Sequence, residues 1–166
     1  MIWQDTKMLM HAFITSHIDY CNALLSGLPK KNISGQGWLQ NSAARVLTKT
    51  RGRAHITPVL KSLHWLPVCF RIDFKVLLLV FKCLNGLGPS YLSKLLLPYE
   101  PSRTLRSSGS RLLVIPKVRT HTHSEAYFQF YGPRLRDSLP EDLRAAENVH
   151  VFKSRLKTHL FSLAFN

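Results

Sequence analysis

Apolar side chains in the first part of the chain recur at helical spacing. Residues 5–26 carry one stripe, formed by Leu9, Phe13, His17, Cys21 and Leu24. Residues 37–50 carry a second, formed by Leu39, Ala43, Val46 and Leu47, with Arg45 and Lys49 on the opposite side. Each pattern predicts an amphipathic helix whose stripe faces the core. We place the start of the second helix at residue 37, because Gly35 and Gly37 oppose helix nucleation before it.

Three further helices are predicted before residue 100. Thr57-Pro58 provides a capping hydroxyl followed by proline at the first helical position, and this short helix ends near Pro67. Residues 69–84 are apolar around most of the helical circumference, which predicts the most buried helix of the protein. Pro89-Ser90 begins another helix that stops at Pro98.

The character of the chain changes after Pro98. Residues 101–110 are rich in Ser, Arg and Gly and predict a loop. Residues 112–118 resemble an edge strand, and the aromatic run at 126–131 is either its hairpin partner or a helical turn. A short helix begins at residues 138–141, and Asn148 caps a last helix with the stripe Val149, Phe152, Leu156, Leu160 and Leu163. We therefore predict a mainly α protein, with a helical region at 1–100 and a small mixed α+β extension at 101–166.

The charge is strongly positive and unevenly distributed. Twenty-three Lys and Arg residues oppose nine Asp and Glu residues, for a net charge of +14. Such a balance favours a polyanionic partner, nucleic acid being the commonest and an anionic membrane surface the rival. Acidic residues are absent from Tyr20 to Ile72 and from Pro101 to Ser124. Two blocks of a single sign favour a binding surface over an ordinary solvated face, which mixes both signs.

The basic side chains of these blocks are the candidate phosphate-binding residues. They are Lys30, Lys31, Arg45, Lys49, Arg51, Arg53, Arg103, Arg106, Arg111, Lys117 and Arg119. Arg45 and Lys49 share one face of the second predicted helix, and the two arginines after them extend this face into a loop. Contacts to backbone phosphates give affinity without base readout. Trp38 and Trp65 have rings that stack on bases, but core packing is the preferred interpretation for both.

No constellation for catalysis stands out. Nucleotidyl transfer needs paired metal-binding carboxylates, and the chain contains no Asp-Asp, while Asp19 and Asp73 lie on separate predicted helices. His17 and Cys21 are one helical turn apart without an orienting acid, so we interpret both as core positions. His121 and His123 lack a third metal ligand. We therefore expect no catalytic residue, no metal site and no cofactor.

Several short stretches, taken in order, carry a family resemblance. They are His17-Ile18-Asp19-Tyr20-Cys21-Asn22-Ala23-Leu24-Leu25, Gln40-Asn41-Ser42-Ala43-Ala44-Arg45-Val46-Leu47, His55-Ile56-Thr57-Pro58-Val59-Leu60, Leu63-His64-Trp65-Leu66-Pro67, Arg71-Ile72-Asp73-Phe74-Lys75, Pro89-Ser90-Tyr91-Leu92, Ser138-Leu139-Pro140 and Phe152-Lys153-Ser154-Arg155-Leu156-Lys157-Thr158-His159-Leu160-Phe161. This ordered series resembles the region after the polymerase palm in LINE-type (non-LTR retrotransposon) reverse transcriptase polyproteins, over nearly the whole chain.

The resemblance implies a thumb-like helical bundle, which in polymerases grips the template–primer duplex, followed by a carboxy-terminal extension. It implies a fragment that is not itself an enzyme and that binds RNA, DNA or their hybrid without sequence specificity. The alternative is a decayed retroelement relic or protein-interaction fragment, which needs the missing polymerase palm as its partner and has no independent function. The basic terminal helix fits an interfacial membrane helix, and the resemblance argues against that third interpretation.

The location of the protein follows from weaker signals. The first residues do not resemble a signal peptide, and the most hydrophobic run, Val76–Phe81, is far shorter than the ~20 residues of a membrane span. Cys21, Cys69 and Cys83 are odd in number and too widely spaced for a zinc site, which suits a reducing compartment. We expect an intracellular protein, in the nucleus, the cytoplasm or both, with no membrane partner.

Overall fold

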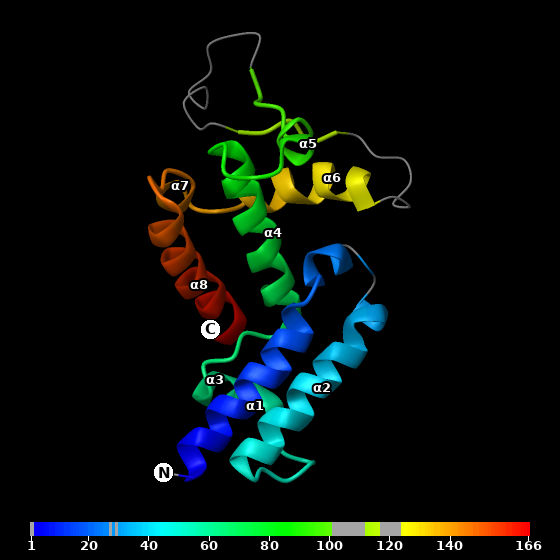
Figure 1. Cartoon of the computed structure of the whole chain (residues 1–166), viewed down its shortest axis with the longest axis vertical. Coiled ribbons are helices and arrows are strands. Elements are labelled where there is room, and N and C mark those ends of the chain that lie inside the picture. Colours follow the sequence, from blue (N-terminus) through cyan, green and yellow to red (C-terminus); the bar gives the residue numbers. More distant parts are fainter. Residues whose placement is uncertain (1, 27, 29, 101–111, 117–123) are drawn as a thin grey trace. The chain divides into compact units, whose positions relative to one another are not determined.

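The computed structural model describes residues 2–26, 28, 30–100, 112–116 and 124–166, and this part of the chain is mainly helical (Figure 1). The mainly α prediction is therefore confirmed. Contacts divide the chain into two compact units, the first comprising Met1–Ile72 with His159–Asn166 and the second comprising Asp73–Thr158. The boundary predicted near residue 100 falls inside the second unit, and it stays a prediction from composition.

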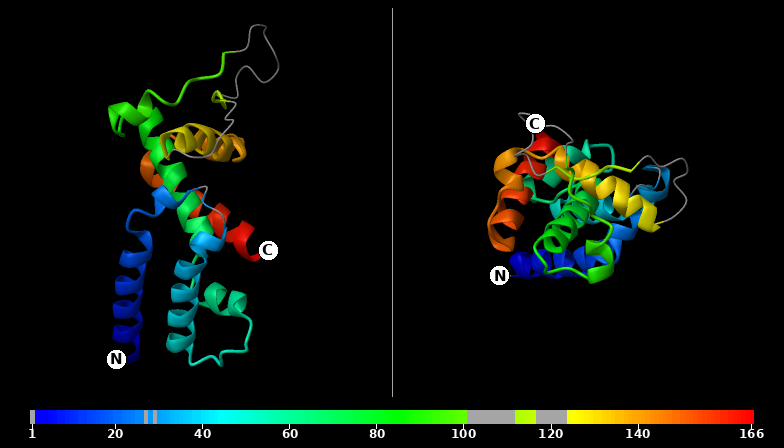
Figure 2. Two further views of the ribbon diagram at one scale, coloured as in Figure 1. Left: turned by 90° about the vertical axis from the view of Figure 1, so that its right-hand side faces the viewer. Right: turned by 90° about the horizontal axis from the view of Figure 1, so that it is seen from above.

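The first unit is built around two neighbouring helices. It contains α1 (Ile2–Asp19), the one-turn 3-10 helix η1 (Asn22–Leu25), α2 (Lys30–Thr48) and α3 (Ile56–Ser62). Helices α1 and α2 run antiparallel and in contact, and α3 packs on α2 (Figure 1, Figure 2). The core of this unit consists of Ala43, Ala44, Leu47, Leu60 and Trp65, against which Met10, Ile14, Ile56, Val59, Leu63 and Phe165 pack.

The face predicted to be buried on α1 is wrong. Leu9 and Phe13 are exposed, Phe13 by 62 %, and the other members of the predicted stripe are exposed as well. The inward face is instead Met10, Ile14 and Ile18, which also recur every four positions. Apolar residues occupy two sides of this helix, so helical spacing alone does not select the side that packs.

The face of α2 is likewise rotated from its predicted position. Ala43 and Leu47 are buried as expected, whereas Leu39 and Val46 are exposed. Gln40 takes the place of an apolar residue on the inward face, where its amide donates a hydrogen bond of 2.8 Å to the Leu66 carbonyl. A buried amide is tolerated because this hydrogen bond replaces the one that the amide would make with water. Spacing does not predict a partner 26 residues away in sequence.

Helix α2 begins at Lys30, seven residues before its predicted start. It therefore continues through Gly35 and Gly37, and a Cβ atom at either glycine would meet nothing within 4 Å. Neither glycine is required by a close contact or a positive φ. Packing of the inward face outweighs their conformational cost, because most helical stability in proteins comes from tertiary contacts.

Three of the described helices end with a left-handed residue that belongs to the same hydrogen-bonded arrangement. These residues are Lys49 (φ 53°) after α2, His64 (φ 57°) after α3 and Gly86 (φ 71°) after α4 (Val68–Leu84). Each is followed by an amide that donates to a carbonyl five residues earlier: Thr50 to Arg45 (3.1 Å), Trp65 to Leu60 (3.0 Å) and Leu87 to Lys82 (2.8 Å). This is the Schellman arrangement, in which glycine is the usual residue at the left-handed position.

The single helix predicted at 5–26 is interrupted. Cys21 adopts a left-handed conformation (φ 52°) between α1 and η1, so the chain changes direction six residues before Gly27. Side-chain bonds flank this break, since Asn22 Nδ2 donates to Asp19 Oδ1 over 3.3 Å. Nothing in the local sequence is a strong helix breaker, which is why the interruption was not predicted.

The second unit packs around α4. Its other helices are α5 (Ser90–Ser93), α6 (Ser124–Asp137), α7 (Glu141–Arg144) and most of α8 (Val149–Phe165). Val76, Leu77 and Val80 of α4 are almost fully buried, which confirms the prediction of a heavily buried helix. The helix predicted from Pro89 to Pro98 is shorter than expected, because α5 ends at Ser93.

Aromatic stacking and one close approach join the helices of this unit. The rings of Phe81 on α4 and Phe152 on α8 stack with centroids 4.2 Å apart. Gly132 on α6 lies against α4 so closely that a Cβ atom would come within 2.9 Å of Val80 Cγ2. A glycine is therefore needed at this crossing, because any side chain would displace α4 or α6.

The predicted mixed α+β extension is not found in the described residues. Residues 126–131 belong to α6, so the helical alternative holds for that run. Leu113 forms an isolated antiparallel bridge with Pro98, supported by the Tyr99 amide to the Leu112 carbonyl at 2.9 Å. Helix is favoured at 126–131 because the buried side of the run, including Phe128, packs as part of a 14-residue helix. The predicted cap of the last helix is confirmed, since Asn148 Oδ1 accepts the Val151 amide at 2.9 Å. Phe152, Leu156 and Leu160 of its predicted stripe are buried, whereas Leu163 is exposed.

Candidate nucleic-acid interface

The outward side of α2 brings basic and aromatic side chains together. Lys31, Trp38 and Arg45 follow one another at intervals of seven residues, which places all three on one side of the helix, and Lys49 comes directly after its last residue. This side lies opposite Ala43, Ala44 and Leu47 in the core. We call the set Lys31, Trp38, Arg45, Lys49, Arg51 and Arg53 the α2 basic face. Its last three members belong to the loop after the helix.

Arg45 organises that loop. Its guanidinium donates hydrogen bonds to the carbonyls of Gly52 at 3.2 Å and Ala54 at 2.9 Å. The loop is closed further by the Ala54 amide, which donates to the Arg51 carbonyl over 3.0 Å. Arg45 therefore has a structural role that sequence analysis missed, and its charge is shared between the loop and any phosphate that it contacts.

The loop presents the remaining cations to solvent. Lys49, Arg51 and Arg53 are all exposed. The left-handed conformation of Lys49 turns the chain at the end of α2, and the Arg45 bonds restrain the segment that follows. An ordered loop would lose less backbone entropy if its side chains bound a ligand than a flexible loop would.

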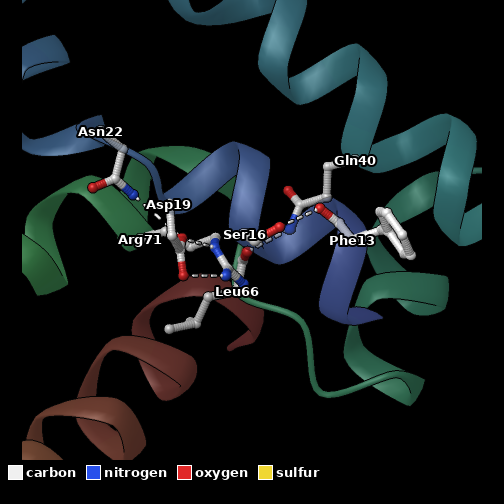
Figure 3. Close-up of polar contacts among 7 residues, drawn as sticks. All are labelled: Phe13, Ser16, Asp19, Asn22, Gln40, Leu66 and Arg71. Atoms are coloured by element: carbon white, nitrogen blue, oxygen red, sulfur yellow. Dashed lines mark hydrogen bonds and ion pairs between the residues drawn. The ribbon is translucent and has the colours of Figure 1, made fainter. Parts of the chain in front are cut away.

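Few carboxylates are present to balance the positive charge of this surface. In the first unit the only acidic residues are Asp5 and Asp19. Asp19 accepts two hydrogen bonds from the Arg71 guanidinium, at 2.9 and 2.7 Å, so its charge is neutralised by a fork-like ion pair (Figure 3). Asp5 is exposed in the first turn of α1. Figure 3 also shows Gln40 of α2, whose amide donates a hydrogen bond to the Leu66 carbonyl.

The two candidate tryptophans differ in burial. Trp65 is 4 % exposed and belongs to the core, as predicted. Trp38 is 72 % exposed on the α2 basic face, so its predicted core position is wrong. The seven-residue spacing from Lys31 to Trp38 to Arg45 was the signal that placed this ring beside the cations. It was masked by the error in the buried face of α2.

The structure does not place all the predicted phosphate-binding residues. Lys30 is the first residue of α2, and the position of its side chain is not described. Arg103, Arg106, Arg111, Lys117 and Arg119 lie outside the described residues, so the second basic block stays a prediction.

The other candidate chemical groups are not brought together. His17 and Cys21 are exposed instead of lying in the core, and Asp19 is held by Arg71. The Asp73 carboxyl accepts a 2.6 Å hydrogen bond from the Tyr131 hydroxyl, and its burial raises the pKa of Asp73 although that bond opposes the rise. Within the described ranges, no three His, Cys, Asp or Glu side chains are arranged to hold a metal ion. His121 and His123 fall outside those ranges.

Sequence analysis did not anticipate a pocket in the second unit. Its volume is about 330 Å³, and Phe81, Tyr99, Leu113, Arg136 and Arg144 are among its lining residues. Arg136 pairs with Asp137 at 3.2 Å, and Asp137 also accepts the Leu113 amide at 3.2 Å. These bonds hold Arg136 in the wall of the pocket, so its charge is already paired within the chain.

Comparison with known proteins adds no relative. No family model matches the chain, and neither a curated protein nor a solved structure matches it. Among the described residues, none of the helices combines the length and the apolar character that a membrane crossing requires.

Proposed function

We propose that the protein is a non-catalytic nucleic-acid-binding module, which contacts backbone phosphates through the α2 basic face without reading sequence. The observation that carries the proposal is the exposed side of α2 and the loop after it, where five cations accompany an exposed tryptophan. The compensating carboxylates of the same unit are reduced to Asp5, because Asp19 is paired with Arg71. Cations clustered without neighbouring carboxylates favour binding of a polyanion.

The resemblance to LINE-type reverse transcriptases supports the same proposal. In that family the corresponding region follows the polymerase palm, and a thumb-like helical bundle with a basic extension fits RNA, DNA or a hybrid as partner. On this proposal the basic residues of the 101–119 segment extend the surface, and no cofactor takes part.

The test is a titration of the purified chain against a labelled RNA–DNA hybrid by fluorescence anisotropy, at low and near-physiological salt. We expect an affinity that falls steeply with salt, because each neutralised phosphate releases counterions and adds about 0.9 to the logarithmic slope. Replacing Arg51→Glu and Arg53→Glu together should lower this slope by about 2. Arg45 is not a clean test, since its substitution also releases the loop.

The matched control is the pair Lys153→Glu and Lys157→Glu, which makes the same change in net charge on exposed residues of α8. If both double variants weaken binding equally, then overall charge and not the α2 basic face is responsible. Anionic vesicles at the same salt serve as the competing surface, and stronger binding to vesicles than to the hybrid would contradict the proposal.

A second candidate function is favoured by one observation. Met8, Leu9 and Phe13 expose apolar side chains on α1, and such a group of residues is typical of a surface that packs on another protein domain. On this alternative the chain is a retroelement relic or interaction fragment that requires the absent polymerase palm. Aggregation of the purified chain, together with no salt-dependent binding, would favour the alternative over the module.

A further inference from the structure

Trp38 is the large aromatic side chain at the centre of the α2 basic face. Exposing an apolar ring to water costs free energy, which a ligand that covers the indole recovers, and the flat ring suits a planar apolar partner. The nucleobase is such a partner, and stacking on aromatic side chains is sequence-tolerant because every base has a π-face. The position of the ring therefore bears on which form of nucleic acid the face accepts.

The surface beside Trp38 is open. On the amino-terminal side of Trp38, towards which a helical side chain leans, the residues one turn away are the small Ser34 and Gly35. A Cβ atom at Gly35 would meet nothing within 4 Å, so no side chain lies against that glycine. Ser42, one turn after Trp38, is also small. Small neighbours leave room for a base on the ring.

Cations stand on both sides of the ring. Lys31 and Arg45 are seven residues before and after Trp38, which is about 10 Å along the axis in each direction. Lys31 is exposed, and beyond Arg45 the loop adds Arg51 and Arg53. A strand whose base lies on Trp38 would therefore have positive charge beside the phosphates on either side of that base.

We propose that the α2 basic face prefers single-stranded nucleic acid, by stacking one unpaired base on Trp38 while the flanking cations hold the backbone. The inference rests on the proposed function and deepens it. In a duplex the bases are already stacked on one another, so extruding one costs a few kcal/mol. The cations alone would bind both forms, and the indole adds affinity only for the form with unpaired bases.

The experiment compares a labelled single strand with a duplex of the same sequence, measured by anisotropy at one salt concentration. Trp38→Ala is expected to weaken single-strand binding by about 5-fold or more, the usual value of one stacked base. Duplex binding should change by less than about 2-fold. Trp38→Phe keeps a stacking ring and is expected to retain most of the single-strand affinity.

Tyr91→Ala is the control, because it removes another exposed aromatic side chain from a helix outside this face. Circular dichroism confirms that each variant folds, which is expected because Trp38 is mostly exposed. If Trp38→Ala leaves single-strand binding unchanged, or weakens both forms equally, the inference is overturned. The proposed function would still hold in that case if binding depends on salt and the Arg51→Glu and Arg53→Glu replacements weaken it. Loss of all salt-dependent binding in the unaltered chain would overturn both.

Discussion

The first unit holds nine lysines and arginines against two aspartates, whereas the second holds fourteen against seven acidic residues, so each has a formal net charge of +7. The same total describes different surfaces. In the first unit Arg71 neutralises Asp19, while in the second Asp73 and Asp137 are bound by Tyr131 and Arg136 among a larger number of carboxylates. The comparison shows that net charge does not describe how the charges are distributed, because the number and the position of the carboxylates differ between the two units.

The largest expected effect lies in the aromatic core of the second unit. Phe152→Ala removes the ring stacked on Phe81 and leaves a cavity at a residue that is almost fully buried, which should cost about 3–5 kcal/mol of unfolding free energy. Urea unfolding followed by circular dichroism measures this loss. Phe152→Leu should recover about half of it. A cost below about 1 kcal/mol would mean that this stack is not part of the stabilising core.

In the first unit, the next largest effect is expected at the ion pair between Asp19 and Arg71. Asp19→Ala leaves the half-buried Arg71 guanidinium without its carboxylate and should cost about 2 kcal/mol, less than a fully buried pair because both side chains keep some solvent. A double-mutant cycle with Arg71→Ala isolates the coupling between the two residues. Additive losses in the two single variants would show that the pair contributes no interaction of its own.

The buried carboxylate of the second unit predicts a dependence of stability on pH. Burial raises the pKa of the Asp73 carboxyl, so between the ordinary pKa of aspartate and this raised pKa the folded state binds more protons than the unfolded state. The contribution of Asp73 to stability is therefore present at low pH and lost as pH rises through the raised pKa. Asp73→Asn keeps an acceptor for the Tyr131 hydroxyl.

Thermal unfolding from pH 4 to pH 7 tests this dependence. The stability of Asp73→Asn relative to the unaltered chain should increase with pH and then level off. Asp142→Asn, which removes the same charge from an exposed side chain, controls for net charge. Parallel curves for Asp73→Asn and the unaltered chain would contradict the prediction.

The smallest effects are expected at two glycines, one from each unit, where replacement by alanine should change stability in opposite directions. Gly35→Ala should stabilise α2 by about 0.5–1 kcal/mol, because alanine loses less backbone entropy and its Cβ atom meets nothing there. Gly132→Ala should destabilise the second unit, because its Cβ atom would come within 2.9 Å of Val80. Thermal melting of both variants measures these changes. Shifts of the same sign in the two melting temperatures would mean that the surroundings of one glycine are wrongly assigned.

Sequence patterns predicted the helical class and many of the helices, because apolar spacing and end signals are local. The α8 cap at Asn148 and the burial of α4 depend on neighbouring residues, and both were found. The buried side of α1 depends on which neighbour it packs against, and Leu9 and Met10 are equally apolar choices. Helical spacing therefore placed α1 with the wrong side inward, and on α2 it predicted the burial of Ala43 and Leu47 but not the exposure of Leu39 and Val46.

The candidate site was predicted less completely than the fold. Basic residues that cluster without acidic residues are visible in a sequence, and Arg51 and Arg53 are exposed as a binding surface requires, while their role stays a prediction. The bonds of Arg45 to Gly52 and Ala54 depend on the path of a loop, and the exposure of Trp38 depends on the rotation of a helix. Neither property is encoded by spacing alone.

The loop that Arg45 holds has a consequence for proteolysis. Lys49, Arg51 and Arg53 offer three cleavage positions within five residues to a protease specific for basic side chains, and all three are exposed. Such a protease needs an extended substrate, whereas the Arg45 guanidinium binds two carbonyls of this segment. Cutting then requires local opening of the loop. The same three side chains would be covered by a bound nucleic acid, so susceptibility to trypsin reports on both the loop's order and its occupancy.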